Sequence, residues 1–515
     1  MAGDLLVRGG TLVDGTGAPA RPADVRLKDG VIAEVGPRLR PDRELLLHAG
    51  GAIVAPGVIN SHTHYDPSLW WDPLVDPMPQ HGVTTVVTGN CSLSLAPVRV
   101  QDQRRASGVF GFIEDIPVDA FSTGIPWLWE SYSEWRDALS AHATAVNVAA
   151  LVGHSNLRVY VMGDDAWERA ATPHEREMLA TVLSGCLAAG ALGMSTSFID
   201  QDRHGTPVPS RRADDEEMVA LLKVLAAAGG GPRVLEFLPW IKDTDRWLND
   251  IERVARWCGD RRVPYTWNQL ATNSRDPSRA ARVVAPAHRL SSEGCDVYAQ
   301  VSPRPFNLNI SFDQTPAFVA GPAWGEVIQL AIRPMCWPIG FSSTISPPEI
   351  RVEAHSHDPA GTAVLIADPT SIVGASDAGA HLRMMGGAGD TTLLLTEHVG
   401  DRGDLTIEAA VDQLTGRLGD VLGIPDRGPG GRPTLSCSRS TNLRICLTRS
   451  FVTYPVVPRA SSGRPAGFGT RSWPGGSPGG RSDHGGSAGR TTDSGSARLI
   501  QAIAFSLATL RGPSA

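Results

Sequence analysis

The sequence predicts an α/β protein whose main part is a (β/α)8 TIM barrel. Short β-branched runs alternate with helical stretches, each unit closes at Gly or Pro, and eight such strands occur over about 320 residues. This rhythm is typical of parallel strands joined by crossover helices. A doubly wound open sheet is the alternative, but no Gly-rich dinucleotide loop follows any of the strands.

The elements follow in order along the chain. Residues 1–57 consist of short strands and turns, and Asp29-Gly30 between two alternating runs predicts a hairpin, because a primed turn needs positive φ at both central positions. The eight barrel strands are predicted at residues 58–62, 83–88, 146–152, 192–197, 234–237, 263–268, 297–301 and 371–376. A helix start is predicted at Thr172-Pro173, where an N-cap precedes a first-turn proline and a capping glutamate, and another helix is predicted over residues 214–228.

The composition divides the chain into three parts. We expect a β module over residues 1–57, the barrel over 58–427 and a tail over 428–515. The tail holds eleven Arg and two Asp with neither Lys nor Glu, and Gly, Ser and Pro crowd residues 461–496. Such a stretch buries too little apolar surface to offset its ordering entropy. We therefore expect most of it to be disordered and the β module to keep an unpaired strand edge.

The origin of the tail is a separate question. Only three lysines stand among the 47 basic residues, a bias typical of GC-rich coding sequence. A mixture of Arg, Ser, Gly and Pro is what such a sequence encodes when it is read in a shifted frame. We hypothesise a frameshift near Gly428 and a similar lesion between Ala331 and Arg351, which sequencing of the locus decides.

Composition also narrows the class of function. The chain has 515 residues, 42% hydrophobic and 20% charged, enough for a large core. It contains no apolar run of about 18 residues and no signal-peptide pattern, so we expect a cytoplasmic protein that does not enter a membrane. Seven cysteines give no disulfide framework, and a net charge of -7 disfavours nucleic-acid binding. A small-molecule substrate is expected, and the oligomeric state is not predicted.

The sharpest chemical signal is a pair of histidines after the first barrel strand, in the segment PGVINSHTH at residues 56–64. Residues i and i+2 of a strand point to the same side, so His62 and His64 can converge on one metal ion. Spacing alone is weak evidence, because such pairs are more often structural or exposed.

Two further candidate ligands follow other strands. The second strand ends in Gly89-Asn90-Cys91, and a thiolate is a strong zinc ligand, although a lone cysteine is usually a small buried hydrophobe. Asp377 follows the eighth strand and would face the barrel mouth. Strands one, two and eight are neighbours in a closed barrel, so Cys91 and Asp377 can meet the histidine pair.

These motifs together resemble the amidohydrolase superfamily, and within it the N-acyl-D-amino-acid deacylases, or D-aminoacylases. The segments that carry the resemblance are 9–17 (GGTLVDGTG), 62–66 (HTHYD), 81–85 (HGVTT), 89–91 (GNC), 147–158, which includes VGHS at 152–155, 190–193 (GALG) and 376–377 (SD). The match runs in order through about the first 320 residues and resumes near residues 368–394.

The resemblance implies a barrel plus a small β-sandwich made from both chain ends, whose C-terminal part is here lost or scrambled, and zinc-dependent hydrolysis of an amide. By position, His62 and His64 would bind metal. Cys91 would take the bridging or ligand role that a carboxylated lysine fills in relatives, and Asp377 would be metal ligand and catalytic acid/base. Zinc would polarise the amide carbonyl and acidify water, and Asp377 would pass the water proton to the leaving amine.

The fifth and sixth strands depart from the family pattern. Relatives supply a histidine from each, whereas these strands carry Glu236 and Asn268, either of which could contribute an oxygen. Two imidazoles, a thiolate and an aspartate would complete a tetrahedron and leave no open position for water unless one ligand lets go. No strand-end lysine is evident for carboxylation, because Lys223 falls in a helical pattern and Lys28 in the β module.

The remaining candidates concern the substrate. An N-acyl amino acid carries a carboxylate and therefore requires a cation near the barrel mouth. We favour Arg383 after the eighth strand, with Arg158 in the third-strand loop as the alternative and His154 as a further substrate-binding candidate in the same motif. His381, one helical turn past Asp377, could bind substrate or orient the aspartate. The histidines at positions 355 and 357 lie in a polar stretch and are expected to be exposed.

Three functions remain open at this point. The first is a zinc amidohydrolase acting on N-acyl-D-amino acids, and the second is a related hydrolase of cyclic amides or ureas. The third is an inactive barrel. The missing histidines favour the third, while the intact His-Thr-His, Cys91 and Asp377 favour the first two.

Overall fold

A computed structural model describes residues 4–28, 31–229, 231, 233–274, 276–311, 349–353, 357–381, 384–424 and 451–455. Several predictions lie outside these residues. They concern the turn at Asp29-Gly30, Arg383, the histidine at position 355, and the segments 331–348 and 428–450 of the frameshift hypothesis. The predicted disorder of residues 461–496 also lies outside the described part.

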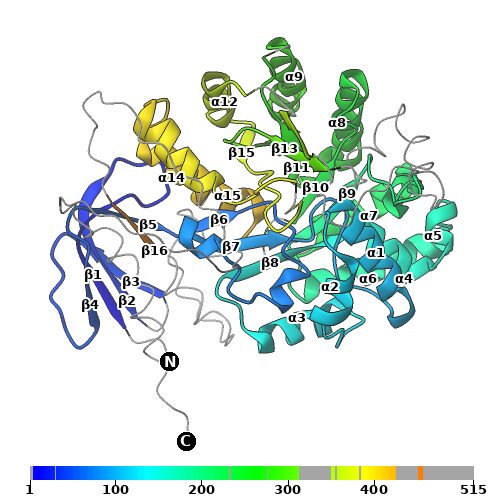
Figure 1. The fold of residues 1–515 in the computed structure, drawn as a ribbon, viewed down its shortest axis with the longest axis horizontal. Coiled ribbons are helices and arrows are strands. Elements are labelled where there is room, and N and C mark those ends of the chain that lie inside the picture. The colour runs from blue at the N-terminus through cyan, green and yellow to red at the C-terminus, as the bar shows by residue number, and fades with distance from the viewer. Residues whose placement is uncertain are drawn as a thin grey trace, which may run out of the picture. The chain divides into compact units, whose positions relative to one another are not determined.

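The barrel sheet contains all eight predicted strands, in parallel and in chain order (Figure 1). They are β6 (Val58–Asn60), β7 (Val83–Thr88), β8 (Asn147–Gly153), β9 (Gly193–Ser197), β10 (Val234–Leu238), β11 (Tyr265–Leu270), β12 (Val297–Val301) and β15 (Ser371–Val373). Beyond the end strands, Thr63 bridges to Ala378 and the His64 amide donates to the Ala378 carbonyl at 2.8 Å. The sheet therefore curls so that its first and eighth strands meet, as the TIM-barrel prediction requires.

Helices surround this sheet in Figure 1. The principal ones are α1 (Gln103–Ile113), α2 (Val118–Gly124), α3 (Tyr132–His142), α4 (His154–Met162), α5 (Asp165–Glu168), α6 (Pro173–Ala188), α7 (Asp215–Ala227), α8 (Thr244–Cys258), α9 (Ser278–Ser292), α12 (Pro359–Ile366), α13 (Asp390–Leu393), α14 (Ile407–Leu414) and α15 (Gly416–Leu422). A π-helical segment covers Leu394–Asp401, and short 3-10 turns cover Ser68–Trp70, Met78–His81, Val100–Asp102, Pro209–Arg212 and Gly259–Arg261. None of the helices in the described ranges is long and apolar enough to cross a membrane.

The predicted helix starts are confirmed. Thr172 caps α6 with a reciprocal capping box to Glu175, and the Asp214 side chain accepts from the Glu217 amide at the start of α7. Leu183 of α6 and Leu221 of α7 have no exposed surface and belong to one large core between the sheet and the helices. Burying a side chain of this size contributes roughly 1.5–3 kcal/mol, so this layer holds the strand ends in fixed positions.

The β module is a six-stranded sheet in the order β16-β5-β1-β2-β3, with β4 paired to β1. Its strands are β1 (Leu5–Leu12), β2 (Arg21–Lys28), β3 (Val31–Gly36), β4 (Leu45–His48), β5 (Ala52–Pro56) and β16 (Phe451–Pro455). Lys28 pairs with Val31 in an antiparallel ladder, which confirms the two strands of the predicted hairpin.

One expectation for the module is wrong. Strand β16, from the Arg-rich C-terminal segment, pairs antiparallel with β5 along its whole length, so the β5 edge is not unpaired. The physical reason is local, because Phe451 to Tyr454 is a run of aromatic and β-branched residues with high strand propensity. A further antiparallel pair, β13 (Asn307–Ser311) with β14 (Glu349–Glu353), was not anticipated.

Candidate metal centre

The two histidines lie just beyond the first barrel strand. Strand β6 ends at Asn60, two residues earlier than predicted, and the chain bends at His62. Thr63 still joins the barrel, because it bridges to Ala378 and its amide donates to the Val87 carbonyl at 3.0 Å. The side chains of His62 and His64 are buried, and their ring centroids are 5.3 Å apart. The two imidazoles thus lie together as predicted, although neither histidine belongs to the strand itself.

Cys91 sits in a constrained loop after the second strand. Gly89 has φ +78°, and a Cβ there would lie 2.2 Å from the Leu151 carbonyl oxygen, so the loop needs glycine at this position. Cys91 and Ser92 follow with positive φ of 53° and 69°. The Ser92 amide donates to Ser195 Oγ at 2.9 Å, which fixes this unusual backbone and the direction of the thiol.

Four predicted residues converge at one point. The ligand atoms of His62, His64 and Cys91 all lie within 4.8 Å of one another. His62 Nε2 is 3.4 Å from Cys91 Sγ and 3.2 Å from Asp377 Oδ1, and His64 Nε2 is 3.9 Å from the same oxygen. The Asp377 side chain is 20% exposed whereas both imidazoles are buried, so the carboxylate stands on the open side of the group.

The chemistry of this donor set fits a transition metal ion. Burial lowers the pKa of His62 and, more strongly, of His64, which keeps both imidazoles neutral and able to bind metal. Burial also raises the pKa of the Cys91 thiol well above its usual value, and the nearby carboxylates raise it further. A bound cation would reverse this effect, because a coordinating thiol loses its proton. Two imidazoles, a thiolate and a carboxylate are typical zinc ligands.

Glu236 at the end of the fifth strand supports the Cys91 loop. Its Oε2 accepts the Cys91 amide at 2.9 Å. In the amide orientation that satisfies both of its atoms, Asn268 on the sixth strand donates to Glu236 Oε1 at 2.6 Å. Both carboxylate oxygens thus accept hydrogen bonds, and burial raises the pKa of Glu236 to about 8. At the two strand ends where histidines were expected, Glu236 and Asn268 thus support the Cys91 loop.

Two residues of the site are not predicted from the sequence. Gln300 on β12 accepts from His62 Nδ1 at 2.8 Å. Glu114, directly after α1, is 2% exposed, and its two oxygens lie 3.5 Å from His64 Nδ1 and 3.4 Å from His381 Nε2. Burial, together with the negative charge of Asp377, raises the pKa of Glu114 well above its usual value. A single acidic residue between two helices carries no motif, so no sequence signal marks it.

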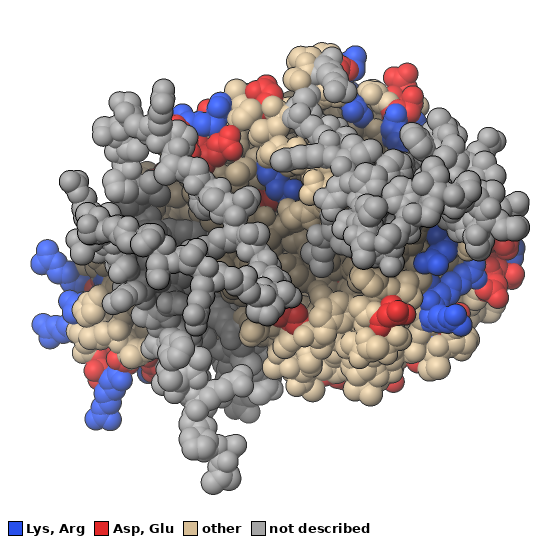
Figure 2. Space-filling view, in the orientation of Figure 1, with Lys and Arg blue, Asp and Glu red and all other residues tan. Residues whose placement is uncertain are grey.

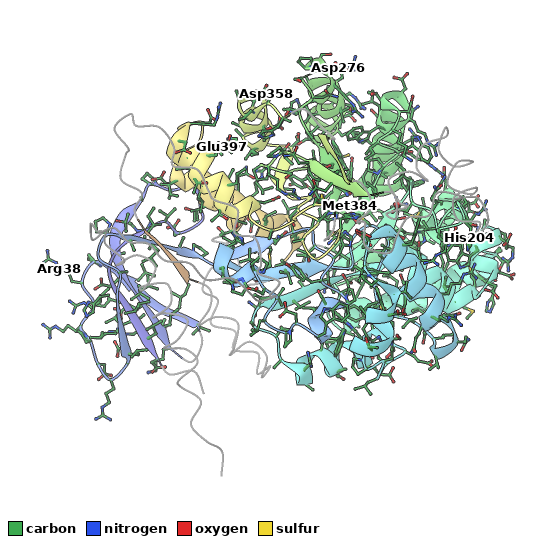
Figure 3. All side chains as sticks on the ribbon, in the orientation of Figure 1. Arg38, His204, Asp276, Asp358, Met384 and Glu397 are labelled. Atoms are coloured by element: carbon green, nitrogen blue, oxygen red, sulfur yellow. The ribbon has the colours of Figure 1, made fainter. Side chains whose placement is uncertain are left out.

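Among the substrate-binding candidates that the structure describes, His381 lies beside the metal group. Its amide donates to the Glu114 carbonyl at 2.6 Å, and its own carbonyl accepts from Met384 at 2.7 Å. Met384, labelled in Figure 3, lies beside β13, and its carbonyl accepts from Asn309 of that strand. The segment after the eighth strand is therefore anchored on both sides.

His154 and Arg158 lie elsewhere, in a buried ion cluster. Neither side chain is exposed, and His154 Nε2 lies 2.8 Å from Glu217 Oε1 while Arg158 pairs with the other oxygen of Glu217. His154 Nδ1 completes the cluster at 3.0 Å from Thr196 Oγ1. The Arg158 guanidinium is thus engaged by a protein carboxylate rather than directed to the barrel mouth. Of the two loop histidines, only His357 is described, and it is half-buried.

A cavity of about 220 Å³ opens beside the end of the sixth strand. Its lining residues are Ile241, Lys242, Trp247, Gln269, Leu270, Ala271, Arg279, Ala280 and Val283. Two cations and no acidic residue are among the described residues that line it. Burial raises the pKa of the nearby Asp200 to about 6, an effect that Lys242 opposes and Asp377 reinforces. The charges of a cavity residue and of a residue in the metal group therefore both act on the pKa of Asp200.

The visible surface carries both signs of charge. Figure 2 shows Lys and Arg interspersed with Asp and Glu among the coloured residues of this face.

A (β/α)8 barrel whose first, second and eighth strands bring two imidazoles, a thiol and a carboxylate to one point has the architecture of a metal-dependent hydrolase. A model of the amidohydrolase family matches residues 47–274. The chain is therefore similar to the amidohydrolase family, and the relatives that it matches are D-aminoacylases and related deacylases.

Two curated relatives illustrate the likeness. D-aminoacylase from Alcaligenes xylosoxydans xylosoxydans is 37% identical over 227 residues, which cover 44% of this chain and 43% of that protein. N-acyl-D-glutamate deacylase from the same organism is 28% identical over 455 residues, covering 82% and 84%. The chain thus spans less than half of the first relative and most of the second.

Two solved structures share the fold. A D-aminoacylase structure concerned with its binuclear metal centre has a TM-score of 0.64 at 26% identity, over 84% of this chain and 89% of that one. N-acyl-D-glutamate deacylase from Bordetella bronchiseptica, solved with zinc and a phosphonate inhibitor, has a TM-score of 0.63 at 25% identity over the same shares.

Proposed function

We propose that this chain is a zinc-dependent amidohydrolase that cleaves the linear amide of N-acyl-D-amino acids. The observation that carries the proposal is the convergence of His62, His64 and Cys91 within 4.8 Å, with Asp377 on the open side. The names of its relatives, which include deacylases of D-glutamate and D-aspartate derivatives, support the substrate class. We expect it to act on a small molecule in the cytoplasm.

Each residue has a distinct task in this proposal. His62 and His64 would hold the metal through Nε2, and Cys91 would supply a thiolate ligand. Bound zinc supplies Lewis acidity to the amide carbonyl and to a water molecule. Asp377 accepts a proton on its carboxylate and delivers it to the leaving nitrogen, because it is the exposed acid of the group.

The cavity at the sixth strand offers the cation that an N-acyl amino acid requires. Lys242 and Arg279 give it positive charge, and Trp247 and Val283 give it apolar walls. A substrate carboxylate would form charge-assisted hydrogen bonds with these two cations. We therefore propose this cavity for a substrate carboxylate, since Arg158 is paired with Glu217 and Arg383 lies outside the described residues.

An inactive barrel is the second candidate. The observation that favours it is the replacement of the expected histidines by Glu236 and Asn268, whose hydrogen bonds are directed to the Cys91 loop and to each other. A hydrolase of cyclic amides or ureas is the other alternative and would use the same donor set.

One experiment separates these functions. Zinc content is measured on the purified protein, and release of amine is then followed with N-acetyl-D-amino acids, their L enantiomers and a hydantoin. We expect about one zinc per chain and turnover confined to the D amides. Bound zinc without turnover of any substrate would indicate the inactive barrel, and turnover of the hydantoin alone would indicate the cyclic-amide hydrolase.

A further inference from the structure

The two metal-binding histidines are oriented by different partners. Each directs Nε2 toward Cys91 or Asp377, which leaves Nδ1 to the surrounding protein. His62 Nδ1 meets the neutral amide of Gln300 at 2.8 Å. His64 Nδ1 has no hydrogen-bond partner within normal geometry in the described part of the chain, and the acceptor facing it is Glu114, 3.5 Å away.

Glu114 also contacts the barrel mouth. Its second oxygen lies 3.4 Å from His381 Nε2, and its main-chain oxygen accepts the His381 amide at 2.6 Å. Glu114 is 2% exposed, and the charges that act on it most strongly are the carboxylates of Asp377, Asp200 and Asp66. Burying an acidic side chain among other acids is unfavourable. The presence of Glu114 here therefore indicates that it acts on the two imidazoles that flank it.

We propose that Glu114 is a positioning residue that directs Nε2 of His64 into the metal site and fixes His381 at the barrel mouth through the same carboxylate. This inference rests on the proposed metal site. Coordination at Nε2 makes the Nδ1 proton a stronger donor, so the contact with Glu114 should shorten and contribute more when the metal is bound. Glu114 thereby couples the geometry of the metal to the position of His381, whose side chain is partly exposed.

The first test is zinc affinity, measured by competition with a chromophoric chelator on Glu114→Ala, Glu114→Gln and the wild type. We expect affinity to fall about 10- to 100-fold in Glu114→Ala, as is usual when the hydrogen-bond partner of a metal-binding histidine is lost. Glu114→Gln should lose less, because its amide oxygen can still accept from His64. Ser107→Ala, on the same helix α1 and bonded to the Gln103 carbonyl, is the matched control and should bind zinc like the wild type.

The second test addresses the coupling. His381→Gln should weaken zinc binding in the wild-type background but have little further effect when Glu114 is already Gln, because both act through one carboxylate. A folded Glu114→Ala with wild-type zinc affinity would overturn the inference and leave the metal site intact. If Glu114→Ala does not fold, the inference would be overturned by two results together. These are wild-type zinc affinity in Glu114→Gln, and additive effects on zinc affinity in the double variant Glu114→Gln, His381→Gln. Absence of zinc binding in the wild type would instead refute the proposed function.

Discussion

His62 Nε2 and Asp377 Oδ1 lie 3.2 Å apart, although the two residues follow the first and the last strands of the barrel. The contact exists because the sheet curls until its outer strands meet, where His64 bonds to Ala378. A nitrogen that can bind metal thus faces an oxygen that can carry a proton. This juxtaposition is the basis of the predicted chemistry.

Asp377→Asn is expected to lower turnover by about 10²- to 10⁴-fold while most of the zinc remains bound. The amide cannot accept and deliver a proton, but its carbonyl oxygen can still face the metal while the histidines anchor it. Zinc content, melting temperature and turnover are measured on one preparation. Full turnover in this variant would remove Asp377 from the mechanism.

The double variant His62→Ala, His64→Ala is expected to lose stoichiometric zinc, since each substitution removes a direct ligand bond. Metal analysis after dialysis against a weak chelator measures this loss. His174→Ala is a suitable control, because this exposed histidine lies at the start of α6, away from the metal group. Retention of one zinc per chain in the double variant would show that the site is elsewhere.

Glu217→Gln is expected to destabilise the fold by about 3–5 kcal/mol at pH 7, because it leaves Arg158 buried without its ion partner. Burial alone would raise the pKa of Glu217, but the hydrogen bond from His154 and the positive charges of both partners lower it from 4.5 to about 2. The wild-type advantage is therefore complete above about pH 4.5 and is lost as the pH falls toward 2.

Urea unfolding at pH 7 and at pH 3 measures this advantage, with the neighbouring Glu216→Gln as an exposed control. The difference between wild type and Glu217→Gln should shrink at the lower pH. Equal unfolding free energies at pH 7 would contradict the assigned ion cluster.

The double variant Lys242→Ala, Arg279→Ala is expected to raise KM for N-acetyl-D-amino acids about 10- to 100-fold with little change in kcat, through loss of charge-assisted hydrogen bonds. Arg282→Ala, on the same helix but paired with exposed Asp276, should leave KM unchanged. Figure 3 shows Asp276 at the outer rim of α9. Three substrates are compared: N-acetyl-D-glutamate, N-acetyl-D-leucine and N-acetyl-D-leucine amide. They differ in whether they carry a side-chain carboxylate, an α-carboxylate or neither, so the comparison shows which carboxylate the cavity binds. An unchanged KM for all three would refute this cavity as the carboxylate site.

The sequence predicts the barrel well because buried parallel strands form continuous apolar runs, and all eight are found where expected. It also predicts His62, Cys91 and Asp377 as neighbours, because the strand ends of a barrel meet at one mouth. Glu114 is not predictable, since its partners arise from tertiary packing rather than from a motif. The pairing of Arg158 with Glu217 is not predictable from the sequence either, because it depends on how α4 and α7 pack, and the sequence therefore suggests Arg158 as a substrate-binding residue.

The proposed centre holds its metal through nitrogen and sulfur together. Zinc K-edge X-ray absorption of the purified protein tests this directly, because it resolves the scatterers around the ion. We predict one sulfur at about 2.3 Å and imidazole nitrogens at about 2.0–2.1 Å, with the sulfur signal lost in Cys91→Ser. A bound zinc whose spectrum shows no sulfur, or one that keeps its sulfur in Cys91→Ser, would contradict the proposed centre.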